Sequence, residues 1–376
     1  MKSPVIADTS QLTIPPDERA FIDRLRGLSI IRVVLVHLGL SWFYPPYSQF
    51  FHNLLPVLFF VSGAVSYYSC LRSNSGRRYL FRRSLSMVGP FYVIAFFSLI
   101  VYWVLTTTVP GFDIGAILRW ITIIPNSEDT PFPMGQIWFI HAMVIIVFLS
   151  FPIFLMSKYS VVPLVLCILA SAVLSISQQI FDINDYFYIM GHNLYQGMVN
   201  LGFFAFGALY YRKMEQLQAG RIITLLILSL SVVLFNIVVL NVDVNMANHS
   251  YSPDSYYLSA SYCAIFLVIL AKRFINYLCN SLHWLDAFIL FYSKHAYSVF
   301  IVHSFSVFWL EQQFHLTDVK TDPLLGVIKL VLVFLISSIL AIPSTWLSKK
   351  LTNSLQNIVL GRTTSTIPEK SKVGIL

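Results

Sequence analysis

The sequence predicts an all-α, polytopic membrane protein with about ten transmembrane helices. Of its 376 residues, 57% are hydrophobic and only 11% are charged, whereas about 25% of the residues in an average soluble domain are charged. Apolar runs of about 20 residues, long enough to cross a bilayer, alternate with short polar gaps. A soluble protein of this composition would expose large apolar patches to water, so this class is excluded.

Ten apolar runs are predicted to span the membrane, and an even number of spans places both termini on the same side. A further apolar stretch, residues 282–291, is too short to cross and is expected to form a cytoplasmic-side helix or a re-entrant segment. The ten predicted spans cover residues 27–44, 53–70, 85–108, 136–156, 161–180, 196–211, 222–241, 254–272, 295–313 and 323–347.

The distribution of Lys and Arg predicts that both termini are cytoplasmic, because basic residues collect in cytoplasmic loops. The most basic loop follows the second predicted span and holds five arginines between residues 72 and 83. We therefore expect a multi-pass protein of the plasma (inner) membrane, with no cleavable leader in the polar first 26 residues. The expected parts are a cytoplasmic arm (1–22), a transmembrane domain (23–350) and a cytoplasmic tail (351–376). The basic residues lie at loop ends on one side, so the net charge of +8 does not indicate nucleic acid.

The first predicted span carries ionisable groups at a depth where they are costly and usually face protein or a wet cavity. Arg26 and His37 are eleven residues apart, which is about 20° beyond three full helical turns. The two side chains are therefore predicted to share one face, roughly 16 Å apart along the axis. Alternatively, Arg26 is a positive-inside anchor and His37 is a histidine bonded to a neighbouring helix.

Small residues in the second span, Ser62 and Gly63, predict a close approach to another helix, expected to be the first span. Arg82 and Arg83 in the basic loop either determine topology only or form a phosphate-binding patch, since Arg matches phosphate oxygens bidentately. Small residues also mark the sixth span, at Gly202 and Gly207.

Further candidates lie in later spans. Trp138 suits an interfacial aromatic belt, and His141 lies one to two turns below the outer edge. His303 is expected at a depth comparable with that of His37, and Glu311 is a candidate partner for Lys329. The four cysteines have no metal-ligand or disulfide spacing, and we assign no metal.

Several segments together resemble the acyltransferase-3 family of integral membrane acyltransferases, over roughly residues 20 to 350. Arg26 and His37 reproduce its Arg-x10-His signature, and residues 59–63 (Phe-Phe-Val-Ser-Gly) resemble its second-helix motif. Residues 138–140 (Trp-Phe-Ile) and 297–303 (Tyr-Ser-Val-Phe-Ile-Val-His) resemble two later motifs. One departure is Met87, which occupies the nearer position of the arginine pair that the family carries before the proline of the third helix. The chain resembles the stand-alone type, without an appended esterase-like domain.

The resemblance implies an O-acyltransferase that moves an acyl group, by default acetyl, from cytoplasmic acyl-CoA (acetyl-CoA) to a hydroxyl of a cell-surface or lipid-linked glycan. This transfer needs a base for the alcohol and a stabiliser for the oxyanion. His37 is expected to be the base, because burial disfavours the imidazolium form. Arg26, with Arg82 and Arg83, is expected to bind the donor. Tyr297, Ser298, His303, His141 and Trp138 are expected to line the substrate path, the last two on the acceptor side.

Two alternatives belong to other classes. A secondary transporter or polysaccharide exporter would use the intramembrane His and Arg residues as a proton-coupled path, although no internal repeat is visible to support it. A structural membrane partner without chemistry would leave Arg26 and His37 on one face unexplained.

Overall fold

The computed structural model describes residues 14–38, 54–73, 75–106, 118–119, 121–123, 137–189, 192–213, 218–314 and 322–360. The described chain is almost entirely helical, which confirms the predicted all-α class. Its α-helices are α1 (Pro16–His37), α3 (Leu54–Arg72), α4 (Gly76–Thr106), α6 (Ile137–Ser157), α7 (Val162–Phe181), α8 (Leu194–Arg212), α9 (Ala219–Val238), α10 (Ser255–Leu270), α11 (Lys272–Ser281), α12 (His283–Lys294), α13 (Ala296–Phe314) and α14 (Pro323–Leu360). Short pieces are η5 (Asn184–Phe187), the paired strands β1 (Tyr188–Ile189) and β2 (His192–Asn193), and η7 (Met246–His249).

Five of the described helices are long and apolar enough to cross a membrane: α3, α6, α7, α9 and α14. The number rises to seven if each of two bent pairs is one span. Helices α10 and α11 meet at 55°, and α12 and α13 meet at 88°. Every predicted span falls wholly or partly on a helix. The short apolar stretch 282–291 corresponds to α12, which turns sharply into α13.

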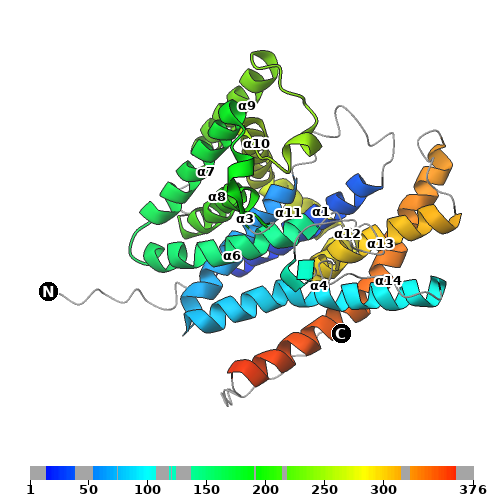
Figure 1. Ribbon diagram of the computed structural model, residues 1–376. Helices are drawn as coiled ribbons and strands as arrows, with labels where there is room; N and C mark the ends of the chain where they lie inside the picture. Colours follow the sequence, from blue (N-terminus) through cyan, green and yellow to red (C-terminus); the bar gives the residue numbers. More distant parts are fainter. Residues whose placement is uncertain are drawn as a thin grey trace.

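Helix α1 lies between two groups of helices (Figure 1). On one side it packs against α3, which belongs with α6, α7, α8, α9 and α10. On the other side it packs against α12 and α13, and α13 packs in turn against α14 and α4. The helix that carries Arg26 and His37 is thus packed against other helices on both sides, and His37 at its end is exposed.

Helices α3 and α8 are joined by two glycines that let their backbones touch. A Cβ atom at Gly63 would overlap the carbonyl oxygen of Phe204, and one at Gly207 would overlap that of Phe60. The close approach predicted from Ser62 and Gly63 is therefore present, but its partner is α8 and not the first span. Small residues on both helices make this contact possible, and the sequence pattern of one helix does not specify its partner.

Helix α1 is fixed to α11 and α12 by the buried Arg24. Its guanidinium donates to both carboxylate oxygens of Asp286, at 2.8 and 3.2 Å, and to the side-chain oxygens of Asn276 and Asn280, each at 2.9 Å. A bidentate pair with added neutral acceptors is the arrangement that best offsets the cost of burying a charge. The second predicted pairing, Lys329 with Glu311, is also present, at 2.7 Å.

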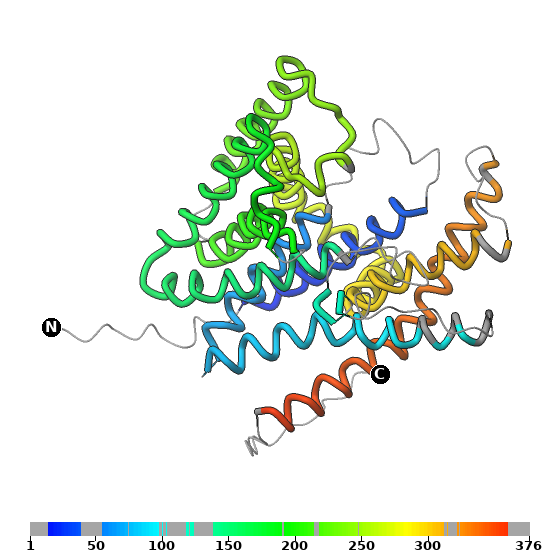
Figure 2. Tube along the Cα trace, viewed as in Figure 1, coloured from blue at the N-terminus to red at the C-terminus, as the bar shows by residue number. Residues whose placement is uncertain are grey.

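Helix α14 is longer than the predicted span 323–347 and continues to Leu360 (Figure 2). Its last part runs alongside α4, the helix that begins in the most basic loop. Thr345, Ser348, Thr352 and Gln356 recur at intervals of three and four residues, so they form one polar stripe on the helix. This stripe positions polar groups opposite the arginines of α4.

Candidate active site

The cavity that contains Arg26 lies where α1, α3, α4, α6 and α13 meet, and we call it the inner cavity. Its volume is about 320 Å³. Apolar and polar side chains share its lining. The apolar ones are Ile30, Leu58, Val65, Met87, Phe139, Met143, Ala296 and Phe300, and the polar ones are Arg19, Arg26, Ser62, Arg83, Ser86, Ser293, Lys294 and Tyr297. A cavity that combines an apolar wall with convergent polar groups is typical of small-molecule sites.

Two residues that line the inner cavity each carry a buried polar atom without a hydrogen-bond partner among the described residues. Within the described part of the chain, neither Nε of Arg83 nor the hydroxyl of Tyr297 has a hydrogen-bond partner. Buried polar groups are normally satisfied, so such exceptions require an explanation. Arg26, by contrast, donates to Asp23 at 2.9 Å, and Arg19 contacts the same carboxylate at 3.3 Å.

The Met87 position has a structural consequence. Met87 is buried and faces the inner cavity, where the family pattern predicts an arginine. Arg83 lies four residues earlier on α4, so it shares the face of Met87 one turn away. The cation is thus displaced along the helix, and the cavity keeps a guanidinium on this wall.

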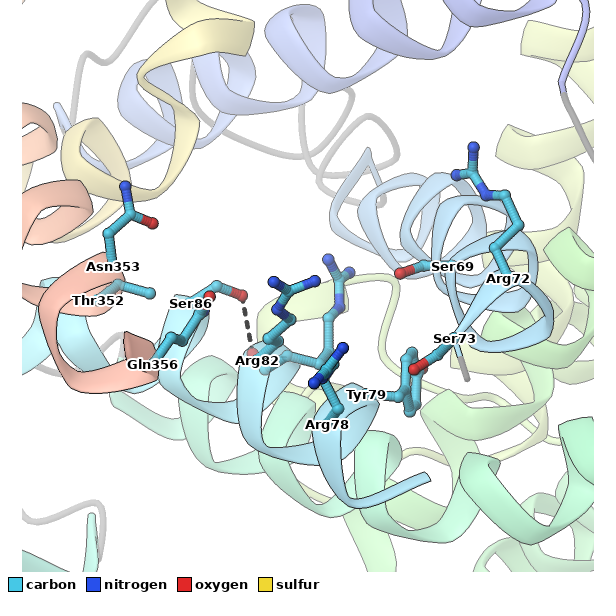
Figure 3. Close-up of a pocket in the computed structure, with 11 residues that line it drawn as sticks. Ser69, Arg72, Ser73, Arg78, Tyr79, Arg82, Ser86, Thr352, Asn353 and Gln356 are labelled. Carbon is cyan, nitrogen blue, oxygen red and sulfur yellow. Dashed lines mark hydrogen bonds between the residues drawn. The ribbon is translucent and has the colours of Figure 1, made fainter. Parts of the chain in front are cut away.

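A larger basic pocket of about 610 Å³ adjoins the inner cavity and shares Arg83 and Ser86 with it. Figure 3 shows Ser69 and Arg72 from α3, Arg78 and Arg82 from α4, and Asn353 and Gln356 from α14 arranged around this pocket. The hydroxyl of Ser86 donates to the Arg83 carbonyl at 2.8 Å. The guanidiniums are accompanied by hydroxyl and amide groups, which suits a phosphorylated ligand.

A third space, the polar pocket, has a volume of about 200 Å³ and lies between α4, α12, α13 and α14. It shares Ser86 and Thr352 with the basic pocket, and Ser86 and Tyr297 with the inner cavity. None of the described residues that line the three spaces is acidic, whereas eight are basic: Arg19, Arg26, Arg72, Arg78, Arg82, Arg83, Lys294 and Lys349. The three spaces adjoin one another, and together they present a cationic surface that suits a polyanionic ligand.

His37 and His303 form a pair at the end of α1. His37 Nδ1 lies 2.6 Å from His303 Nε2, and the two ring planes are nearly parallel, at 9°, with centroids 4.8 Å apart. His303 Nδ1 is 3.1 Å from the Val299 carbonyl, to which it donates. His303 Nε2 is then the acceptor, so this pattern assigns the proton of His37 to Nδ1 and leaves His37 Nε2 with a free lone pair. His303 is fully buried and His37 is exposed, so the ring that carries the lone pair is the accessible one.

The position of His37 differs from the expectation of a mid-span residue. It is the last residue of α1, which starts at Pro16 and not near residue 27. Residues 39–44 of that predicted span lie outside the described residues. Because α1 is continuous from Arg26 to His37, the predicted common face of these two residues is kept, and Ile30 lies on it between them.

Aromatic rings separate the inner cavity from the histidine pair. His37 and His303 are not among the residues that line the cavity. Phe300 lines it and lies 6.0 Å from the His303 ring, centroid to centroid, and Phe139 packs on Phe300 at 4.8 Å. Phe300 therefore lies between the cavity and His303, and the described residues show no open path from Arg26 to His37.

A second histidine pair involves the predicted acceptor-side residue His141. Its Nε2 lies 2.7 Å from Nδ1 of His192 in β2, and the rings are stacked. Trp138 lies 6.1 Å from the exposed ring of Tyr251. Ser298 does not join these residues, because it lines the polar pocket instead.

Sequence reasoning missed several residues of this region. Lys349, Thr352 and Asn353 lie beyond the predicted end of the last span, and the polar stripe of α14 is the signal that indicates them. Phe139 and Phe300 carry no chemical signal in the sequence. His192 lies between two predicted spans, and only the fold brings it to His141.

The comparisons with known proteins show the family of this chain. A family model described as an acyltransferase domain matches residues 19–346. This match covers the helices that carry Arg26, His37, Arg83 and Tyr297, and the chain belongs to the acyltransferase-3 family of membrane acyltransferases. No curated protein and no solved structure matches the chain.

Proposed function

We propose that this protein is an O-acyltransferase that takes an acyl group, by default acetyl, from cytoplasmic acyl-CoA and transfers it to a hydroxyl of a cell-surface or lipid-linked glycan. The supporting observation is the cationic surface of the three adjoining spaces, which leads into the inner cavity. The ring of Phe300 lines this cavity and lies next to His303, the hydrogen-bond partner of His37. Acyl-CoA has the matching order of groups, with phosphates at one end and an apolar thioester arm at the other.

In this proposal the basic pocket binds phosphate, and Arg26 with Arg83 binds polar groups of the pantetheine arm inside the inner cavity. This surface lies at the basic end of the helices, so the proposal places it, with both termini, on the cytoplasmic side of the plasma membrane. The thioester reaches the histidines when Phe300 moves aside. His141 and Trp138 lie on the opposite, acceptor side.

The chemistry assigned to the histidine pair is general base catalysis. His37 Nε2 takes the proton of the acceptor hydroxyl as its oxygen attacks the thioester carbon. The carbon–sulfur bond then breaks, and the CoA sulfur leaves with the proton that His37 held. The acceptor gains an ester, CoA leaves as the free thiol, and His37 returns to its neutral form. His303 keeps its hydrogen bond to His37 Nδ1 throughout and so fixes the working tautomer.

The test uses purified protein in lipid nanodiscs, where no ion gradient exists. Label from acetyl-CoA is followed into a glycan fraction from the host, with CoA thiol release as a second readout. Transfer that is present in the wild type and lost in His37→Ala, with unchanged protein abundance, supports the proposal. Activity that requires a gradient across sealed vesicles would favour the transporter alternative, and near-normal activity of His37→Ala would remove the proposed base.

A further inference from the structure

The polar pocket has the composition of an anion site separate from the arginines of α4. Lys294 and Lys349 supply its charges, and they are exposed. Ser298, Ser348 and Thr352 supply hydroxyls on buried side chains. Lysine binds phosphate as a point charge, whereas arginine binds it through a planar fork. The two neighbouring pockets therefore present different cation chemistry to a ligand.

One hydroxyl in the polar pocket is preset to donate. The hydroxyl of Thr345 donates to Ser298 Oγ at 2.8 Å, and His295 Nδ1 lies 2.9 Å from Thr345 Oγ1. Since Thr345 donates to Ser298, His295 Nδ1 is the donor to Thr345. Within the described residues the Ser298 hydroxyl accepts from Thr345 and donates to no acceptor, so its proton is available to a bound anion.

The polar pocket lies at the junction between the other two spaces. Thr352 and Asn353 line both it and the basic pocket, and Lys294 and Tyr297 line both it and the inner cavity. Ser86 lines all three. The basic pocket and the inner cavity also share Arg83, so a ligand that extends from one to the other passes Ser86 and lies beside the polar pocket.

We propose that the polar pocket binds the diphosphate of the acyl-CoA donor through Lys294, Lys349 and the Ser298 hydroxyl, while the basic pocket binds the ribose 3′-phosphate. This inference rests on the proposed function and assigns a separate pocket to each of the two anionic groups of the donor. The order of the spaces matches the order of the groups along the molecule, with the 3′-phosphate at one end, the diphosphate in the middle and the pantetheine arm after it.

The experiment compares three donors: acetyl-CoA, acetyl-3′-dephospho-CoA and S-acetylpantetheine, which lacks the diphosphate and the nucleotide. Steady-state KM values are measured for purified protein in nanodiscs. We expect Lys349→Gln to raise KM about tenfold or more for the first two donors, and not for S-acetylpantetheine, because one charge-assisted contact is lost. The ratio of the KM values for acetyl-CoA and acetyl-3′-dephospho-CoA should remain that of the wild type. Lys349→Arg, which keeps the charge, should recover most of the affinity.

Arg78→Gln in the basic pocket should give the complementary pattern. It should reduce the wild-type preference for acetyl-CoA over the 3′-dephospho donor and leave the KM of that donor nearly unchanged. Matched controls are Lys350→Gln and Arg77→Gln, whose side chains are exposed neighbours that do not line either pocket. Both controls should stay within about twofold of the wild type, since neither side chain lines a pocket that the donor is proposed to occupy.

Several outcomes would overturn the inference. An equal rise of the KM for all three donors in Lys349→Gln would mean that Lys349 has a structural role. If this equal rise depends on anionic lipid in the nanodisc, the pocket binds a lipid phosphate. Loss of the 3′-phosphate preference in Lys349→Gln, or wild-type behaviour of this variant, would also contradict it. If the wild type uses none of the donors, the proposed function itself fails.

Discussion

His303 acts through His37, so its replacement is the sharpest perturbation of the histidine pair. In the wild type, His303 Nε2 lies 2.6 Å from His37 Nδ1 and accepts its proton. His303→Leu removes this acceptor. Both neutral tautomers of His37 are then populated, and the ring loses its orientation. His303→Gln offers a side-chain oxygen that can accept the same proton, and it serves as the matched variant.

The size of the effect follows from one buried hydrogen bond. Leaving a buried group without its partner costs about 1–3 kcal/mol, and about 1.4 kcal/mol corresponds to a tenfold change in rate. We expect His303→Leu to lower kcat roughly 5- to 150-fold, with KM for acetyl-CoA unchanged because His303 lies outside the donor cavity. His303→Gln should recover much of this loss, and His37→Ala should lose the full general-base contribution of about 10²- to 10⁴-fold.

The assay is thiol release from acetyl-CoA by protein in nanodiscs, with acceptor present at saturation. Thermal unfolding of each variant separates lost chemistry from lost fold. Equal activity of His303→Leu and the wild type would refute the assignment of the tautomer. A rise in KM at constant kcat would refute it as well, because a positioning residue for the base acts on the chemical step.

Three other predictions concern donor size, packing and pH. Phe300→Ala should open the end of the inner cavity and raise the ratio of kcat/KM for butyryl-CoA to kcat/KM for acetyl-CoA, measured by competition between the two donors. An unchanged ratio would show that this ring does not limit the length of the acyl chain. Gly207→Ala should destabilise the α3–α8 contact by about 1–3 kcal/mol or more through overlap with the Phe60 carbonyl, seen as a lower melting temperature in detergent. Burial of His249 lowers its pKa, but the 2.7 Å hydrogen bond to Asp254, the charge of that carboxylate, and the carbonyl and charge of Asp243 together outweigh this and leave the pKa raised. The pair therefore stabilises the fold fully below about pH 6.5 and less as the pH rises through the raised pKa. The melting temperature of His249→Gln should accordingly approach that of the wild type as the pH is raised from 6 to 9. A difference in melting temperature that stays constant over this range would contradict the prediction.

Periodicity and composition predict much of the fold because they report directly on single helices. Apolar runs located the helices, and the helical repeat placed Arg26 and His37 on one face of α1. The contact between helices is not encoded in this way. Gly63 signals a close approach, yet only the three-dimensional packing shows that Gly207 is its partner.

The candidate site was predictable where a residue type carries its own chemical signal. The charges of Arg83 and Lys329 and the imidazoles of His37 and His303 stand out in an apolar sequence. Phe300 resembles the many other phenylalanines of the chain, so its place between cavity and histidines could not be inferred. The polar pocket also escaped prediction, because α14 continues past the end of its apolar run and the pocket forms only when it packs on α4.

The central claim is that the acyl group of CoA reaches His37 from the cavity that Arg26 lines. The most direct measurement is a cryo-EM map of this protein with acetonyl-CoA, in which a ketone replaces the reactive thioester. We expect the ribose 3′-phosphate at the arginines of α4, the pantetheine arm beside Arg26, and the ketone carbon within roughly 6–7 Å of His37 Nε2, which leaves room for one acceptor oxygen between them. An analogue bound elsewhere, or a ketone that stays behind an unmoved Phe300, would contradict it.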